Sequence, residues 1–257
     1  MSNKLSSKGL LCALALALFA APALVAAQSP AVEAARAAAA DYDRDGARTI
    51  LTEACDSGDK AACRSLLGQL DRSFDDEDEV AARALASDLC DSGDVLGCIT
   101  LVRYAGDGDG GDIDQPLQRE TAIKACRAGV ANACYQAGQM TREGEGGPQD
   151  RALSAELLEL ACEGNSIAGC QLYADILVQR GWDASDEAET TMHWSAAREV
   201  MARACELGDG YSCTQFAEMM IEGRGGEVDR PTAMALLEQT CLTDQYQCRE
   251  WLKYHAP

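Results

Sequence analysis

The sequence predicts an all-α fold, an α/α solenoid of about five to six helical pairs stapled by disulfides. Six cysteine pairs recur along the chain, five with seven residues between the cysteines and the last with six. The first cysteines of the pairs stand at 55, 90, 126, 162, 205 and 241, so four of the five steps are 35 or 36 residues long. A fixed period of this length is typical of a repeat architecture in which each repeat is one supersecondary unit.

Residues 1–27 have the features of a secretory signal peptide. Lys4 and Lys8 precede an apolar stretch, and the small residues at 25–27 form a cleavage site. The apolar run is interrupted by Pro22 and lacks a basic flank after it, so we expect no retained membrane anchor. Cleavage after Ala27 would yield a periplasmic or secreted protein without stable membrane insertion.

Cleavage would remove two lysines and Cys12. The remaining chain has 20 basic and 42 acidic side chains. A surface this acidic repels phosphate backbones and anionic headgroups, so we expect neither nucleic acid nor a membrane surface as a partner.

Twelve cysteines remain, an even number that favours a disulfide framework in an oxidising compartment. The spacing of seven residues is wider than that of zinc-ligand pairs, so we expect no metal and no cofactor. The predicted disulfides are Cys55 with Cys63, Cys90 with Cys98, Cys126 with Cys134, Cys162 with Cys170, Cys205 with Cys213 and Cys241 with Cys248.

The chain order predicts a capping segment at 28–44, followed by the solenoid at 45–257. One helix of each pair should end near the first cysteine, because apolar residues stand four positions before it and small residues eight positions before it. The residues four before are Leu51, Ala86, Ala122, Leu158, Met201 and Leu237. Those eight before are Ala47, Ala82, Ser154, Ala197 and Ala233, with Gln118 as the exception.

The other helix should carry the second cysteine near its start and bury the residue three positions later, which is Leu66, Leu101, Ala137, Tyr173, Phe216 or Trp251. Asp114, Asp150 and Asp229, each with a proline nearby, are expected helix N-caps. The long step of 43 residues contains the segment 180–194, which we expect to lengthen a turn or the start of one helix.

Between the cysteines of a pair, a glycine should end the first helix in the left-handed conformation. These glycines are Gly58, Gly93, Gly129, Gly164 and Gly208. Asp59, Asp94 or Asp209 can then cap the next helix. Each disulfide would therefore staple a turn between two helices.

The segments CTQFAEMMIEGRGG (213–226) and DRPTAMALLEQTC (229–241) resemble the Sel1-like repeat, a relative of the tetratricopeptide repeat. The cysteine spacing is similar to that of the disulfide-rich secreted branch typified by the Helicobacter cysteine-rich proteins. The resemblance covers residues 45–254, and the long step, the shorter last cysteine pair and the early position of Gly164 depart from it. It implies an interaction scaffold, or alternatively a penicillin-binding protein or weak β-lactamase.

A serine β-lactamase needs a nucleophile with a lysine one helical turn later and further partner motifs. Ser57 and Lys60 provide the first element alone, inside a predicted disulfide turn, and no Lys-Thr-Gly follows. We therefore expect no catalytic residue, and a protein partner in place of a substrate.

Acidic loops raise the alternative of calcium binding. Asp41, Asp43 and Asp45 are spaced as in an EF-hand loop, but the twelfth position is Thr52. The loop at 107–114 is also rich in aspartate. In both places, capping or solvation of a turn is the competing interpretation.

A binding surface is expected on the helices that carry the second cysteines, at positions one, two and five after it, because these positions vary between copies. Its candidate residues are Ile99, Arg103, Tyr135, Gln139, Gln171, Thr214, Gln215 and Glu218. A partner with a basic or mixed surface would complement the acidic chain.

Overall fold

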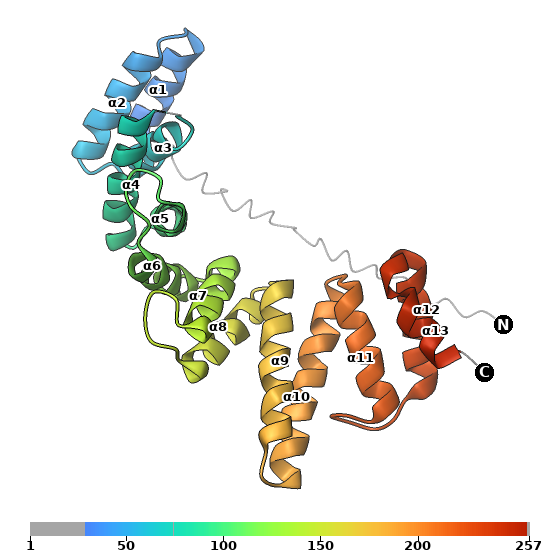
Figure 1. Ribbon diagram of the computed structural model, residues 1–257. Coiled ribbons are helices and arrows are strands. Elements are labelled where there is room, and N and C mark those ends of the chain that lie inside the picture. The colour runs from blue at the N-terminus through green and yellow to red at the C-terminus, as the bar shows by residue number, and fades with distance from the viewer. Residues whose placement is uncertain (1–28, 74, 256–257) are drawn as a thin grey trace, which may run out of the picture.

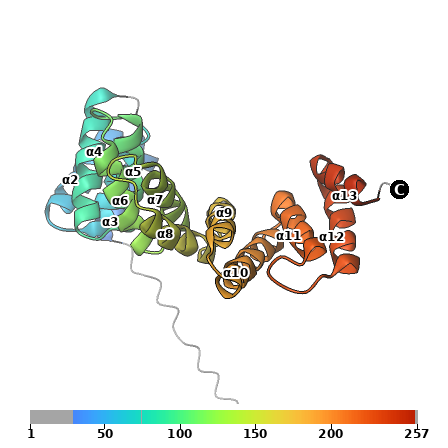
Figure 2. The ribbon, with the colours of Figure 1, turned by 60° about the horizontal axis from the view of Figure 1, so that its bottom comes forward.

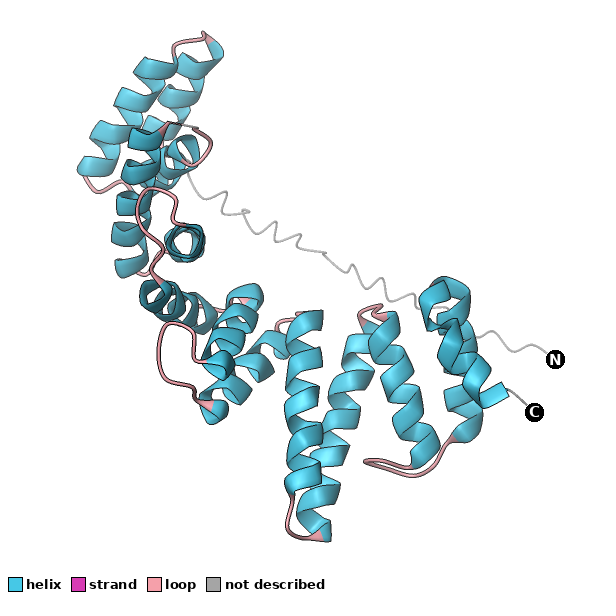
Figure 3. Cartoon of the chain, in the orientation of Figure 1, coloured by secondary structure: helices cyan, strands magenta, loops and turns pink. Residues whose placement is uncertain are grey.

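The computed structural model describes residues 29–73 and 75–255. This part of the chain consists of helices and their connections, so the predicted all-α solenoid is confirmed (Figure 3). The helices follow one another along an open arc, seen from two sides in Figures 1 and 2. The predicted signal peptide, residues 1–27, lies outside the described residues.

Each disulfide-stapled pair has a leading helix, which ends one or two residues after the first cysteine, and a following helix, which carries the second. The leading helices are α2 (Arg44–Asp56), α4 (Asp76–Asp91), α6 (Gln115–Arg127), α8 (Arg151–Glu163), α10 (Glu187–Glu206) and α12 (Arg230–Thr243). The following helices are α3 (Lys60–Leu70), α5 (Val95–Asp107), α7 (Ala131–Glu143), α9 (Ile167–Asp183), α11 (Gly210–Glu222) and α13 (Cys248–His255). Before them, α1 (Pro30–Ala40) packs on α2 and α3, and the 3-10 turn η1 (Gln245–Gln247) precedes α13.

The core runs along the stack between leading and following helices. All six residues four positions before the first cysteines are buried, as are the five small residues eight positions before them. Burial of a leucine such as Leu51 or Leu158 contributes about 1.5–3 kcal/mol. The exception, Gln118, is half-buried, and a Cβ on Gly106 would lie 2.1 Å from its Nε2 atom. The larger side chain of Gln118 is therefore accommodated by the missing side chain of Gly106.

The predicted N-caps are confirmed. The Asp114 carboxylate accepts a hydrogen bond from the N–H of Leu117 at 2.9 Å, and that of Asp229 accepts from the N–H of Thr232 at 3.1 Å. Asp150 accepts from two N–H groups of α8, both at 3.0 Å. Each cap stabilises its helix by about 1 kcal/mol.

Six disulfides join the two cysteines within each pair, with Cα atoms 4.3–4.6 Å apart. In the first five pairs, the third residue after the first cysteine closes a left-handed C-cap. In the first turn, the N–H of Gly58 donates to the carbonyl of Cys55, and the N–H of Asp59 donates to that of Ala54. These are the two bonds of a Schellman motif, so the disulfide joins helix ends that the backbone already brings together.

The prediction for Gly164 is wrong. Its φ is −80°, whereas Asn165, the next residue, has a φ of 65°. The left-handed residue must stand three positions after the first cysteine for the two backbone bonds to form, and asparagine tolerates this conformation better than most residues. The turn keeps its register, and the residue type changes.

Three connections between a following helix and the next leading helix share one structure and the sequence Gly-x-Gly-Gly-x-x-Asp: 108–114, 144–150 and 223–229. Their middle glycines have positive φ and lie against the backbone of the preceding leading helix; a Cβ on Gly146 would be 2.2 Å from the carbonyl oxygen of Gln115. An arginine of that helix donates to the loop carbonyls. Arg119 reaches Pro148 at 2.9 Å, and Arg83 reaches Asp112 at 2.9 Å.

The long step forms a different hairpin. The helices α9 and α10 have 17 and 20 residues, compared with 13 in α7 and α8, and the connection at 184–186 is shorter than the glycine loops. The additional residues therefore lengthen the helices. The predicted alternative of a longer turn is wrong. Trp182 and Trp194 meet edge to face with ring centroids 5.0 Å apart, and the Arg224 guanidinium lies over both rings.

Candidate interaction surface

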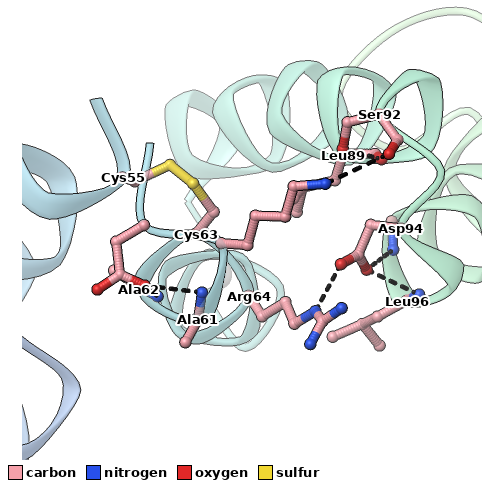
Figure 4. Close-up of polar contacts among 12 residues, drawn as sticks. Cys55, Ala61, Ala62, Cys63, Arg64, Leu89, Ser92, Asp94 and Leu96 are labelled. Carbon is pink, nitrogen blue, oxygen red and sulfur yellow. Dashed lines mark hydrogen bonds and ion pairs between the residues drawn. A yellow bond between two sulfur atoms is a disulfide. The ribbon is translucent and has the colours of Figure 1, made fainter. Parts of the chain in front are cut away.

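The first position after the second cysteine connects some pairs to the next pair. Arg64 Nε on α3 donates to Asp94 Oδ2 at 2.5 Å, and Gln171 Nε2 on α9 donates to Asp209 Oδ2 at 2.8 Å. Figure 4 shows the Arg64–Asp94 contact beside the disulfide of Cys55 and Cys63. Both aspartates cap the following helix of the next pair, and Asp94 is only 3% exposed.

In three repeats the residue at this position matches the cap of the next pair. Where the cap is Val130, which makes no side-chain hydrogen bond, the residue at the first position is the apolar Ile99. Two sequence-predicted surface residues consequently differ in role: Gln171 connects two repeats, whereas Ile99 is 43% exposed.

Thr214 does not belong to a surface. It is 1% exposed, and its hydroxyl contacts the carbonyl of Gly210 at 3.0 Å and the Gln247 side chain at 3.2 Å. The prediction that it lines a binding surface is wrong, because the short last pair places η1 directly over this part of α11.

The fifth position after the second cysteine carries the most varied side chains. Arg103 is exposed, pairs with Asp71 and Asp109, and lies 4.5 Å from the ring centroid of Tyr104. Glu218 pairs with Lys253 at 2.9 Å, which connects α11 to α13. Arg103 remains exposed in these ion pairs, whereas Glu218 is half-buried, as are Tyr135, Gln139 and Gln215.

On α5, three residues form an exposed stripe. Leu96 is 44% exposed, Ile99 lies one helical turn further, and Arg103 follows after another turn. Residues three and four positions apart lie on one face of a helix, so the stripe combines two apolar side chains with one cationic side chain. Leu96 is outside the set predicted from the sequence, because it precedes the second cysteine.

Ser57 and Lys60 do not form a catalytic pair in this structure. The Ser57 hydroxyl donates to the carbonyl of Ala54 at 2.7 Å, and the Lys60 amine contacts the carbonyl of Ser92 at 3.4 Å. The two residues stand on opposite sides of the helix break at Gly58, so Lys60 does not follow Ser57 on one helix.

The acidic loops satisfy protein groups. Asp43 Oδ1 accepts from the N–H of Gly46 at 2.8 Å as the N-cap of α2, and Asp41 closes α1 as its C-cap. In the loop 108–114, the carbonyls of Asp109 and Asp112 accept from the guanidinium of Arg83. Across residues 29–73 and 75–255, no group of three or more histidine, cysteine, aspartate or glutamate side chains is arranged to hold a metal ion.

A groove between α8, α9 and α10 has a volume of 660 Å³ and was not anticipated from the sequence. Tyr173 and Val200 contribute apolar surface, and glutamates of both leading helices contribute carboxylates. Burial and a hydrogen bond to Glu159 raise the pKa of the Tyr173 hydroxyl to about 12. The sequence signal that could have shown the groove is Glu159 and Glu163, four residues apart on one helix face.

In the described residues, no helix combines the length and the apolar composition that a bilayer crossing requires. The six disulfides indicate an oxidising environment outside the cytoplasm.

No protein-family model and no curated protein matches the chain. Solved structures do. A protective antigen of uropathogenic Escherichia coli that displays an SLR fold is 21% identical, with a TM-score of 0.63 over 80% of this chain. A Sel1 repeat protein from Oxalobacter formigenes is 19% identical, with a TM-score of 0.60 over 83% of this chain.

This chain spans 43% and 61% of the lengths of those two solved chains. The similarity extends along most of the described helices, and the predicted resemblance is confirmed at the level of the fold. The chain has the Sel1-repeat fold, in a version with a disulfide between the helices of every pair.

Proposed function

We propose that the protein is an exported repeat scaffold that mediates protein–protein interaction. The observation that supports this function best is the exposed stripe of Leu96, Ile99 and Arg103 on α5. Elsewhere in this helix, large apolar side chains such as Leu101 and Tyr104 are buried. Interface centres combine apolar side chains with arginine, and a rigid helix presents them without a large ordering cost.

The open arc supports the same function. Each repeat contacts its neighbours along the stack, so the following helices present successive surfaces to a partner. The partner is a protein, and an overall acidic scaffold favours a basic or mixed surface. Nucleic acid is not a proposed partner.

The experiment is retention of a partner from periplasmic extract by the oxidised, immobilised protein. Ile99→Ser together with Arg103→Ser should reduce retention about thirtyfold or more, because two hot-spot truncations of about 1–2 kcal/mol each cost about 2–4 kcal/mol together. Val80→Ser is the control, since Val80 is an exposed apolar residue of α4 outside the stripe. Equal retention by the stripe variant and the wild-type protein would contradict this surface.

We propose that residues 1–27 direct export and are removed, that residues 28–44 act as the N-terminal cap, and that the solenoid covers 45–257. The described part of α1 supports the cap, because Val32 and Ala35 are buried against α2 and α3. The mature protein from a periplasmic or culture fraction should begin at Gln28 in N-terminal sequencing. An uncleaved N-terminus in that fraction would contradict the proposal.

No observation favours the β-lactamase alternative. Turnover of a chromogenic cephalosporin by the purified protein should not exceed that of a denatured control. Turnover that disappears in Ser57→Ala with an unchanged helical signal would overturn the scaffold proposal.

A further inference from the structure

The groove between α8 and α10 has a chemical character that the stripe on α5 lacks. Its side walls carry four carboxylates, and its lining includes the ring of Tyr173 and the side chains of Val200 and Leu207. The four carboxylates belong to exposed residues: Glu159, Glu163, Glu199 and Glu206.

The single cation in the groove is already engaged. Arg203 donates to the carbonyl of Glu163 at 2.8 Å and to Asn165 Oδ1 at 3.1 Å. It therefore ties α10 to the turn after α8. None of the ion pairs found in the described part of the chain involves the four glutamates.

The carboxylates are spread along the helices. Four residues of α-helix separate Glu159 from Glu163, a rise of about 6 Å, and seven separate Glu199 from Glu206, a rise of about 10 Å. Side chains on one face of an extended peptide repeat about every 6.6 Å. The spacing of Glu159 and Glu163 thus matches that of successive side chains on one face of an extended chain.

The apolar part of the groove selects the kind of cation. Lysine and arginine have aliphatic stems that pack on apolar surfaces while the charged ends reach polar groups. Tyrosine is neutral at physiological pH, and burial with the hydrogen bond to Glu159 raises the pKa of Tyr173 still further, so its ring is an uncharged surface for such a stem. A volume of 660 Å³ lies in the range of ligand-binding clefts.

We propose that this groove docks an extended basic segment of a partner protein, with alternate lysine or arginine side chains against the glutamates and their stems on Tyr173 and Val200. The assignment rests on the proposed scaffold function and names a second surface and the chemistry of its partner.

The test uses a fluorescein-labelled peptide of alternating lysine and leucine, titrated with the oxidised mature protein at low ionic strength. A variant with all four glutamates changed to glutamine should bind it about tenfold more weakly, because several exposed pairs are lost together. A matched variant loses the same number of charges on exposed residues outside the groove. Its changes are Glu33→Gln, Glu53→Gln, Glu227→Gln and Glu238→Gln.

The matched variant should bind within about twofold of the wild-type protein, since distant exposed charges are largely screened. Equal weakening in both variants would mean that net charge alone attracts the peptide and would overturn the proposal. Undetectable binding to the wild-type protein would also overturn it. Thermal melts must show that both variants remain folded.

Two further measurements test whether a protein segment is the ligand of the groove. Spermine that competes as well as the peptide would show that the groove takes free polycations, and would overturn the assignment to a protein segment. Partner retention by Ile99 and Arg103 is a separate measurement. If a partner is retained but the peptide does not bind, the groove proposal fails and the scaffold function stands. If the peptide binds but no partner is retained, the scaffold function fails although the groove binds a basic peptide.

Discussion

The hairpins α7–α8 and α9–α10 hold successive parts of the stack in two different ways. The first turns through a glycine-rich loop whose carbonyls bind Arg119 of the preceding leading helix. The second has a short connection at 184–186, and longer helices that meet through Trp182 and Trp194. Equivalent hairpins of the repeat are thus held in two ways. One uses hydrogen bonds from an arginine to loop carbonyls, and the other uses packing of two aromatic side chains.

The comparison predicts that the long hairpin depends on side-chain volume. Trp194→Ala should destabilise the protein by about 3–5 kcal/mol, because a nearly buried indole leaves a cavity beside Gly181 and Met201. Trp182 is 65% exposed, so Trp182→Ala should remove mainly the edge-to-face contact, about 1 kcal/mol. Chemical denaturation measures both. Equal losses would show that the two rings do not have these different roles.

The regular hairpin should depend on backbone approach instead. Gly146→Ala should destabilise by about 3 kcal/mol, since the new Cβ would clash with the Gln115 carbonyl at a φ of 68°. Gly58→Ala is the matched control: its φ is 95°, but no atom lies within 4 Å of the place that a Cβ would take. About 1 kcal/mol is expected there. If Gly58→Ala lowers the free energy of unfolding as much as Gly146→Ala does, the positive φ angle causes the loss and the contact with Gln115 does not.

The staples are common to both regions. Replacing Cys126 and Cys134 by alanine should destabilise by about 2–3 kcal/mol, and the same change at Cys205 and Cys213 should have a similar effect, because both disulfides close loops of equal length. Urea denaturation of the oxidised proteins measures the loss. Non-reducing peptide mapping should find only the six disulfides within turns. A disulfide between cysteines of different turns would contradict this pairing.

The period and the cysteine spacing were sufficient to predict the fold, because the residue four positions before the first cysteine is buried in all six repeats. The residue three positions after the second cysteine follows the prediction less closely, since Tyr173, Phe216 and Trp251 are half-buried. Local conformation was less predictable. Gly164 was predicted to take the left-handed conformation because it is the glycine of its turn. That conformation belongs to the third residue after the first cysteine, which in this turn is Asn165.

The surface was the least predictable part. Variation between copies marked Thr214 and Gln171 as free, yet one is covered by η1 and the other bonds to the next cap. A single copy of the repeat does not contain its neighbour, so contacts between repeats do not appear in its pattern. The groove at α8 and α10 is also formed by two repeats, for the same reason.

The smallest expected effect concerns the cap that ends the glycine loop before α12. Hydrogen bonds from the Thr232 side chain and N–H, together with the positive charge of Arg198, lower the pKa of the Asp229 carboxyl below its ordinary value of about 3.9. A lowered folded-state pKa stabilises the protein above the unfolded-state pKa, and this contribution is lost as the pH falls through the folded-state pKa. Asp229→Asn keeps a capping acceptor but does not titrate.

The variant should therefore melt close to the wild-type temperature at pH 7 and lose less stability than the wild-type protein as the pH falls below about 4. Thermal melts followed by circular dichroism from pH 7 to pH 2 measure the difference. Glu238→Gln, on the exposed face of the same helix, is the matched control and removes a carboxylate that caps nothing. If both variants reduce the loss of melting temperature at acidic pH by the same amount, general charge repulsion explains the pH dependence. The cap at the end of the glycine loop would then not explain it.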